Sequence, residues 1–225
     1  SIKVALACLH ARLVVTPSAN TPSWDQVTMF AAAAFFLLGI ERFLYGYIYH
    51  FPESFKVRFK FMSDGKIPWS EVAKQLGIYI KVFQFGVIGY DLFLRGERAG
   101  IGAAPFLMMV IGAILIAVGQ LLNVAVFNAI GAKGVYYGTQ LGEDVPWCEK
   151  FPYNIPGFSD PQYWGVILFV WGVYCMLSPS VVIFGAHFVV PWLETFWYIC
   201  SMKLLESTKN GQAALSILGV SLKNN

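Results

Sequence analysis

Ionisable side chains interrupt the apolar runs of this sequence, and among them Glu41, Lys81 and Asp91 could do chemistry. A charge inside hydrocarbon is costly, so each position is a functional-site hypothesis, and conduction of protons or lipid is the chemistry that such residues could support. Each also has a structural interpretation. Glu41 could pair with Lys81 or another helix, and Lys81 could snorkel from near a helix end. Asp91 could form an i,i+4 surface pair with Arg95. Adjacent residues do not face each other on a helix, so Glu41 and Arg42 are not expected to meet.

A glycine series, GAKGVYYGTQLG, is the second feature that could do chemistry. Gly131, Gly134, Gly138 and Gly142 are spaced by 3, 4 and 4 residues, so all four could share one helix face. Glycine lets another backbone or a ligand approach closely. Two interpretations follow, helix–helix packing through small residues and a ligand groove.

The segment KFPYNIPGFSDPQYWG, residues 150–165, is unusually stiff and aromatic for a connection between apolar stretches. Asp160 is a candidate N-cap and Pro161 a candidate first helical residue. Tyr163 and Trp164 would then lie in the aromatic belt where a helix enters the bilayer. The segment is either a rigid re-entry loop or a lid beside a headgroup site.

Metal and haem chemistry receive little support from the sequence. The four cysteines show no C-x-x-C spacing, which argues against a zinc or redox motif, and no metal site is predicted. His50 and His187 could be imagined as haem ligands, but they lack a partner pattern, and packing or an interfacial position is the favoured role.

Composition places the chain among all-α integral membrane proteins. Of its 225 residues, 57% are hydrophobic and 13% charged, with a mean hydropathy of +0.59. Soluble domains carry roughly 25% charged residues. The apolar runs are continuous rather than alternating, which excludes a membrane barrel. The net charge of +3 is spread along the chain, so phospholipids and the membrane surface are expected partners and nucleic acid is not.

The elements that must position these residues are four apolar regions, 27–51, 76–94, 101–130 and 163–205. Ser178-Pro179 divides the last, because proline disfavours helical geometry at the residue before it. We therefore expect four to five transmembrane helices with a split C-terminal hairpin. Ser70 is a candidate N-cap for the second helix, and the basic, aromatic stretch 52–77 is expected at the interface, favoured for the inner side.

Domain organisation follows from the same regions. Residues 1–26 form an N-terminal segment, 27–205 a single membrane-embedded domain and 206–225 a polar tail. The chain begins at Ser1 rather than Met, and its first 24 residues include Lys3 and Arg12 but no acid. That pattern is mildly similar to the end of a transit peptide.

The C-terminal half resembles the phosphatidylethanolamine N-methyltransferases. FPYNI followed by DPQYWG is similar to their FPFNI, short spacer and NPMYWG-like residues. The glycine series resembles their G-x-x-G-x-x-x-G-x-x-x-G stretch, and Ser178-Pro179 falls about where the family has Ser-Pro. The resemblance covers residues 111–198, whereas the first half matches only in pattern.

The resemblance implies transfer of methyl groups from S-adenosylmethionine to an ethanolamine phospholipid headgroup. Catalysis would rest largely on positioning and on a desolvated amine. The implied cofactor-binding residues are Gly119, Gly131, Gly134 and Gly138. The implied headgroup residues are Tyr153, Asn154, Tyr163 and Trp164.

Two departures from the family pattern open an alternative. The first glycine of the family's G-x-G motif aligns with Ala117, and its tandem glutamates align with Ile199 and Cys200. Glu194 and Glu206 are the nearest substitute acids. Charged hydrogen bonds contribute ~1.5–3 kcal/mol each, so losing two without compensation would weaken cofactor binding by ~10²-fold or more.

The alternative function is therefore that of a catalytically inactive relative. Such a chain would bind no cofactor and would serve as a lipid-binding, structural subunit of a larger membrane complex, for example a mitochondrial respiratory assembly. Other membrane-protein subunits would then be its partners. The mitochondrial inner membrane and the endoplasmic reticulum are the two expected locations.

Overall fold

The computed structural model describes residues 24–94, 104–146, 150–155, 160–178, 183 and 186–207. Every regular element in these ranges is helical, which confirms the all-α prediction for this part of the chain. The elements are α2 (Trp24–His50), α3 (Pro52–Arg58), α4 (Lys60–Ser63), α5 (Trp69–Leu94), α6 (Phe106–Val135), α7 (Pro161–Leu177), η1 (Ala186–Phe188), α8 (Val189–Cys200) and η2 (Ser201–Leu205).

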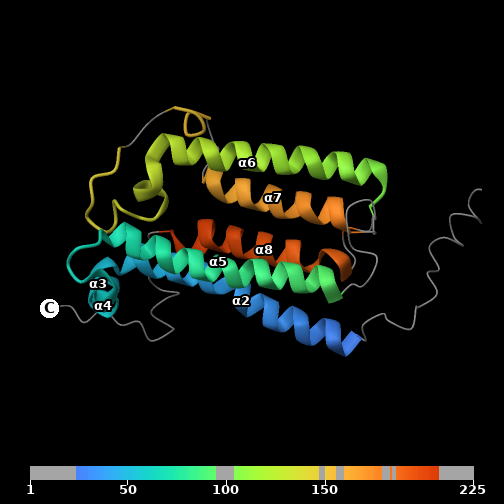
Figure 1. Ribbon diagram of the computed structural model, residues 1–225, viewed down its shortest axis with the longest axis horizontal. Coiled ribbons are helices and arrows are strands. Elements are labelled where there is room, and N and C mark those ends of the chain that lie inside the picture. Colours follow the sequence, from blue (N-terminus) through green and yellow to red (C-terminus); the bar gives the residue numbers. More distant parts are fainter. Residues whose placement is uncertain are drawn as a thin grey trace, which may run out of the picture.

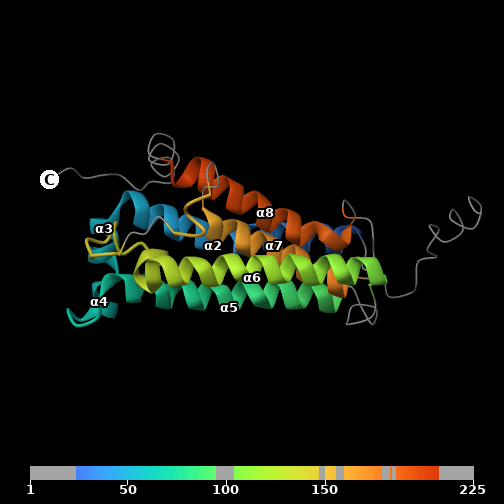
Figure 2. The ribbon, with the colours of Figure 1, turned by 90° about the horizontal axis from the view of Figure 1, so that it is seen from above.

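The long helices form one bundle in which successive helices run in opposite directions along a common axis (Figures 1 and 2). α6 lies against α7, while α2 contacts both α5 and α8, and α7 contacts α8. The short helices α3 and α4 sit at the end of the bundle where α2 finishes and α5 begins (Figure 1). α6 and α8 also finish toward this end, so the predicted site residues near their C-termini are brought together there.

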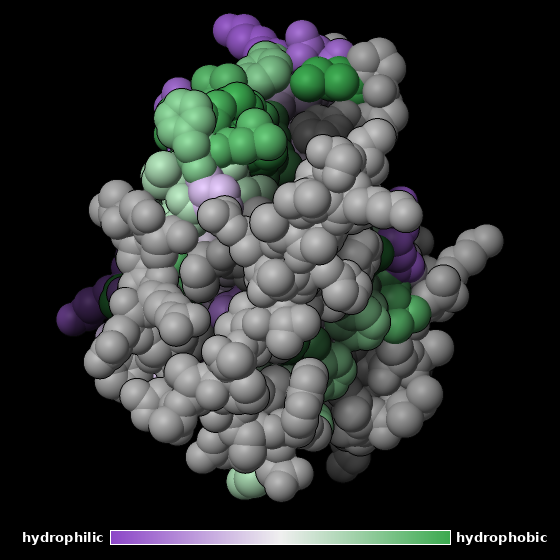
Figure 3. Space-filling view, turned by 90° about the vertical axis from the view of Figure 1, so that its right-hand side faces the viewer, coloured by the Kyte–Doolittle hydropathy of each residue, from purple (hydrophilic) through white to green (hydrophobic). Residues whose placement is uncertain are grey.

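Two helical stretches, Met29–His50 and Phe106–Val135, are long and apolar enough to cross a membrane. α7 is apolar but shorter. Large apolar side chains on the outside of α6 are exposed, among them Phe106, Ile114 and Leu121. Apolar side chains also gather at the upper left of Figure 3, below hydrophilic ones at the top, in a view of the opposite end of the bundle. These are features of a membrane protein.

The division at Ser178-Pro179 is confirmed. α7 ends at Leu177, and Ser178 adopts an extended backbone (φ −82°, ψ 134°), the geometry that proline favours in the residue before it. Among the described residues of the second half, η1 precedes α8, which starts at Val189. Both helices of the predicted hairpin are therefore short.

Glycines set the spacing between α6 and α7. A Cβ added at Gly112 would lie 2.6 Å from the carbonyl oxygen of Gly172, and one at Gly119 would lie 2.5 Å from that of Gly165. Within each helix the two glycines are seven residues apart, about two turns, so they face the partner helix together. Small residues allow membrane helices to approach this closely.

We expect Gly119→Ala to destabilise the fold by about 1–3 kcal/mol, because the new methyl group would overlap backbone atoms of α7. Gly86→Ala in α5 is the matched control, since nothing lies within 4 Å of its added Cβ. That change should be neutral or stabilising by up to about 1 kcal/mol. Thermal unfolding in detergent, followed by circular dichroism, measures both, and equal midpoints would contradict the packing role.

The glycine series does not share one helix face, so that prediction is wrong. Gly131 has φ 66° and ψ 178°, which breaks helical geometry inside α6, and the helix ends at Val135. Beyond it, Gly138 donates its N–H to the carbonyl of Lys133 (2.8 Å), and Gly142 has φ 79°. Glycine permits these positive φ values, and the series therefore makes a kink and a turn.

The start of α5 is held by a distant carboxylate. α5 begins at Trp69, and the N–H and hydroxyl of Ser70 donate to Glu143 at 2.8 and 2.7 Å. The predicted N-cap role of Ser70 is wrong, because the carbonyl of Pro68 accepts the first helical hydrogen bonds. Glu143 instead satisfies the free N–H from outside the helix and ties the turn after α6 to α5.

Candidate functional site

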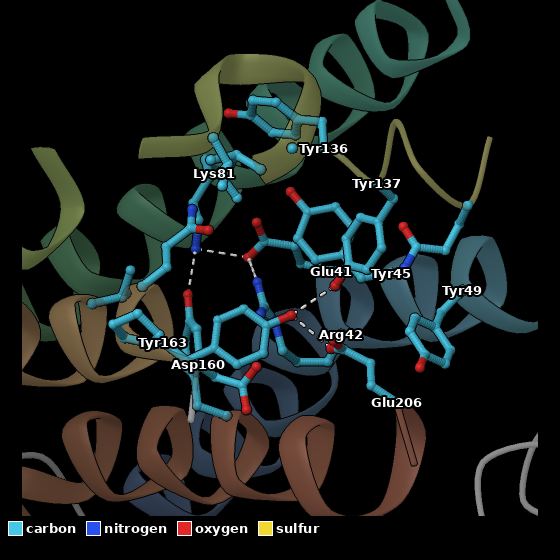
Figure 4. A pocket seen from close by; sticks show the side chains of 18 of the residues that line it. Glu41, Arg42, Tyr45, Tyr49, Lys81, Tyr136, Tyr137, Asp160, Tyr163 and Glu206 are labelled. Atoms are coloured by element: carbon cyan, nitrogen blue, oxygen red, sulfur yellow. Dashed lines mark hydrogen bonds and ion pairs between the residues drawn. The ribbon is translucent and has the colours of Figure 1, made fainter. Parts of the chain in front are cut away.

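A cavity of about 280 Å³ lies at the bundle end where α2, α6 and α8 finish (Figure 4). Its lining is rich in tyrosine and in charge. The tyrosines are Tyr45, Tyr49, Tyr136, Tyr137, Tyr153, Tyr163 and Tyr198, and the charged residues are Glu41, Arg42, Lys81, Asp160 and Glu206.

A buried ionic group forms one wall of the cavity. One carboxylate oxygen of Glu41, Oε2, lies 2.7 Å from Arg42 Nη2 and 2.7 Å from Lys81 Nζ. Glu41 is 1% exposed and Arg42 2%. The expected pairing of Glu41 with Lys81 is confirmed, whereas the snorkelling of Lys81 is not, because its amine turns into the bundle. The expectation that Glu41 and Arg42 do not meet is also wrong, since the long arginine side chain reaches back to the carboxylate.

Three tyrosine rings surround the guanidinium of Arg42. Its Cζ lies 4.1 Å from the ring centroid of Tyr198, 4.8 Å from that of Tyr163 and 4.9 Å from that of Tyr45. Such cation–π contacts stabilise a desolvated cation by up to about 2 kcal/mol. Nε and Nη1 of Arg42 are buried and have no hydrogen-bond partner among the described residues.

Lys81 connects this wall to α8. Its Nζ donates to Gln84 Oε1 (2.9 Å) and to the hydroxyl of Tyr198 (3.0 Å), and Gln84 donates to the carbonyl of Leu38 (3.0 Å). Glu194, one turn before Tyr198, is buried near the same cluster but does not line the cavity. Its Oε2 has no hydrogen-bond partner in the part of the chain that the structure describes.

The π-helical segment η2 directs Glu206 into the cavity. The N–H of Glu206 donates to the carbonyl of Ser201 (2.9 Å), which closes the wide turn, and the hydroxyl of Ser201 donates to Glu206 Oε1 (2.5 Å). His50 Nε2 donates to the carbonyl of Leu205 (2.7 Å) and so fastens η2 to α2. Single π-turns are frequent at functional sites, and here the turn places a carboxylate.

Two tyrosines extend the hydrogen bonding of Glu206. The hydroxyl of Tyr163 donates to Glu206 Oε1 (2.6 Å) and lies 2.7 Å from the hydroxyl of Tyr137. Burial is the largest cause that raises the pKa of Tyr137 well above its usual range, and the neighbouring Tyr163 and Glu206 raise this pKa further. Tyr137 therefore stays protonated and takes part in these hydrogen bonds as a neutral hydroxyl.

The cavity brings together part of the predicted site. Four of the predicted residues line it, namely Gly134, Tyr153, Tyr163 and Glu206. Gly119 lies in the α6–α7 contact instead, which favours packing over cofactor binding. Five more predicted residues do not line the cavity, namely Gly131, Gly138, Asn154, Trp164 and Glu194.

One interpretation of the 150–165 segment is wrong, and the N-cap position of Asp160 is confirmed without its side-chain hydrogen bond. Tyr163 is 9% exposed and points into the cavity, so it does not belong to an interfacial belt. Pro161 does begin α7, but the side chain of Asp160 makes no capping hydrogen bond. The backbone of Asp160 is left-handed (φ 54°), and its carbonyl accepts from the N–H groups of Tyr163 and Trp164.

Asp91 lies apart from the cavity. It is 1% exposed, and Oδ2 accepts a hydrogen bond from the hydroxyl of Tyr174 (2.7 Å), which joins α5 to α7. The predicted surface position of Asp91 is therefore wrong, and its proposed partner Arg95 lies outside the described residues. Within those residues, no cluster of three or more His, Cys, Asp or Glu side chains could hold a metal ion.

Arg42 and several tyrosines of the cavity were not predicted as site residues. The charged pair inside an apolar run was the available signal, since it marked Glu41 as a functional-site hypothesis. Tyr45 lies four residues after Glu41, so the helical repeat places both on one face. Tyr198 had no signal beyond its position before the residues that replace the family's glutamates.

Comparison with known proteins identifies the C-terminal half. Residues 107–208 match the phospholipid methyltransferase family. The resemblance inferred from the motifs is thus confirmed and extends slightly beyond residues 111–198. Glu206 lies inside the matched stretch, whereas Glu41, Arg42 and Lys81 lie outside it.

A curated relative of this half is a phosphatidyl-N-methylethanolamine N-methyltransferase from Arabidopsis thaliana. The two chains are 43% identical over 54 residues, which is 24% of this chain. The similar stretch spans about a third (32%) of the length of that relative. No solved structure matches the chain.

Proposed function

We propose that this protein is an S-adenosylmethionine-dependent N-methyltransferase of ethanolamine phospholipids. The observation that carries the proposal is the position of Glu206. It lies near the end of the stretch that matches the family, and η2 aims its carboxylate into a tyrosine-lined cavity. The family's glutamates align with Ile199 and Cys200, which do not line the cavity, so the turn supplies an acid from further along the chain.

The residues around Glu206 fit a sulfonium cofactor. Glu41 is already neutralised by two cations, whereas Glu206 forms no ion pair within the described ranges. A carboxylate that is hydrogen-bonded but not ion-paired, with tyrosine rings beside it, suits a cationic ligand. Gly134 leaves the cavity wall without a side chain at one point. Glu206, Tyr163, Tyr153 and Gly134 would hold the cofactor, which supplies the methyl group.

The side chains also suit the needs of the acceptor amine. An ethanolamine headgroup carries an ammonium, and it must lose a proton before its nitrogen can take a methyl group. Glu206 Oε1 is the acceptor at the end of the Tyr137–Tyr163–Glu206 hydrogen-bond chain. Enclosure in the bundle removes water from the amine and leaves it more nucleophilic.

The membrane arrangement belongs to the same proposal. α5, α7 and the η1–α8–η2 unit would cross the bilayer beside α2 and α6, which makes five crossings, within the expected four to five, in a single domain over residues 27–205. α5 supports this, because it presents exposed apolar side chains such as Val82 and Phe83. The inner mitochondrial membrane or the endoplasmic reticulum would house it.

A second candidate function is that of a catalytically inactive lipid-binding subunit of a larger membrane complex. Arg42 favours it, because its guanidinium already fills a cage of three tyrosines that could otherwise receive a cationic ligand. The absence of adjacent glutamates at Ile199 and Cys200 points the same way.

The two candidates separate in one experiment. The protein is purified in detergent, S-adenosylmethionine binding is measured by calorimetry, and transfer of labelled methyl groups to phosphatidylethanolamine is followed in mixed micelles. We expect saturable binding and labelled N-methylated lipid. The lack of saturable binding would reject the enzyme, and co-purification with a stoichiometric membrane complex would favour the subunit.

A further inference from the structure

Arg42 and Lys81 give the cavity a positive pole that methyl transfer does not use. Both line the cavity, and both pair with the same oxygen of Glu41. Two cations and one carboxylate leave this ion-paired group with a formal charge of +1. Glu194 is the other buried acid nearby, but it lies outside the cavity and forms no ion pair with either cation. Glu41 and Arg42 are buried and the Lys81 side chain is 29% exposed, and a largely desolvated group with excess positive charge favours an anionic ligand.

Two nitrogen donors of the Arg42 guanidinium have no hydrogen-bond partner among the described residues. Nη2 is engaged by Glu41, whereas Nε and Nη1 are buried and unpartnered in the described part of the chain. The rings of Tyr45, Tyr163 and Tyr198 hold the guanidinium in place, so the side chain loses little conformational freedom when a ligand binds. A rigid guanidinium with free N–H groups is the side chain best suited to phosphate oxygens.

We infer that Arg42 and Lys81 form an oxyanion site that binds the phosphate of a phospholipid headgroup. Tyr163 lies between this pole and Glu206, with its ring centroid 4.8 Å from Arg42 Cζ and its hydroxyl 2.6 Å from Glu206 Oε1. Positive and negative groups therefore face one cavity across a single tyrosine (Figure 4). An ethanolamine headgroup has the complementary charges, a phosphate and an ammonium separated by two carbons.

The surroundings favour a lipid over free phosphate or the carboxylate of a soluble ligand. On α5, Ile78 is exposed one turn before Lys81, and Tyr79 and Val82 are exposed on the same helix, so this helix carries apolar surface as well as the cation. Acyl chains could cover such surface while the phosphate reaches the cations. α3, with Lys56 and Arg58, lies at the same end of the bundle, where headgroups would be expected.

This inference concerns binding alone and holds for an active or an inactive chain. It shares with the proposed function only the placement of the headgroup in this cavity. Its test therefore measures lipid affinity without methyl transfer, so that loss of activity and loss of phosphate binding are separate results.

The test is calorimetry of the full chain in phosphate-free detergent buffer with dihexanoyl phosphatidylethanolamine, dihexanoylglycerol and inorganic phosphate. We expect the phospholipid to bind at least tenfold more tightly than either other ligand. Lys81→Gln should weaken phospholipid binding about tenfold and leave dihexanoylglycerol unchanged. Lys74→Gln is the matched control, because Lys74 lies on the same helix, pairs with Glu71 and does not line the cavity.

Glu41→Gln is expected to change the phospholipid affinity in the opposite direction to Lys81→Gln. It frees Arg42 and Lys81 from their carboxylate, so we expect the folded variant to bind the phospholipid several-fold more tightly. If this variant does not fold, Arg42→Lys replaces it, and the loss of the planar fork should weaken binding about tenfold.

Three outcomes would overturn the inference. The first is equal affinity for the phospholipid and dihexanoylglycerol, and the second is equal behaviour of Lys81→Gln and Lys74→Gln. The third is inorganic phosphate binding as tightly as the lipid with the same dependence on Lys81.

Discussion

Replacing Glu206 with glutamine is expected to lower methyl transfer to phosphatidylethanolamine by about 10²-fold. The substitution removes the carboxylate charge that the proposed cofactor needs, and a charged hydrogen bond contributes about 1.5–3 kcal/mol. It also removes the proton acceptor at the end of the Tyr137–Tyr163 chain. Initial rates with labelled cofactor, measured in mixed micelles for the wild type and the variant, give the ratio.

Two further glutamates make this test specific. Glu53→Gln should leave the rate unchanged, since the Glu53 side chain is 81% exposed, pairs with Lys56 and does not line the cavity. Glu194→Gln separates the two acids predicted from the sequence, because Glu194 is buried outside the cavity. We expect Glu194→Gln to keep most of the activity. A wild-type rate for Glu206→Gln, or loss of activity only in Glu194→Gln, would remove Glu206 from the mechanism.

Ser201→Ala tests how Glu206 is positioned. Ser201 donates to Glu206 Oε1 at the start of η2, and its loss should lower the rate about tenfold without removing the carboxylate. The KM for the cofactor should rise more than kcat falls, because the charge remains but is held less firmly. Equal rates for Ser201→Ala and the wild type would show that the π-turn backbone alone places Glu206.

The sequence predicts the helices of this protein better than it predicts the site. Hydropathy marks α2 and α6, and Ser178-Pro179 marks the division before α8, because these signals are local. Glu206 depends on a π-turn that widens the end of α8, and no residue pattern in Ser201–Leu205 announces it. A gapless alignment therefore finds Ile199 and Cys200 where acids are expected, while the fold brings Glu206 to the cavity from further along.

The glycines also show that the sequence does not reveal the tertiary role of a residue. Gly119, Gly131 and Gly138 look alike in the sequence, yet the first packs against a helix, the second breaks a helix and the third lies in a turn. The role of a glycine depends on what approaches it, which is a tertiary property. Likewise, the rule that adjacent helical residues do not meet describes where side chains start and not how far an arginine reaches.

The second large effect is expected at Glu41, whose removal should destabilise the protein more than an ordinary substitution. Glu41→Gln leaves Arg42, which is 2% exposed, without its ion pair, and breaking a buried pair costs about 3–5 kcal/mol. Unfolding in detergent, followed by tryptophan fluorescence, measures the loss. Removing the unpaired charge should recover part of it, so we expect Glu41→Gln with Arg42→Gln to cost clearly less than the sum of the single changes.

A second cycle on an exposed ion pair provides the reference for this coupling. Lys56 and Glu53 lie 2.7 Å apart, at the same separation as Arg42 and Glu41, but at the surface of α3. Because water screens an exposed pair, its coupling should not exceed about 1 kcal/mol, against 1–3 kcal/mol for the buried one. Equal coupling in the two cycles would mean that the Arg42 environment is wet, and the cavity wall would then lack the electrostatic strength that phosphate binding requires.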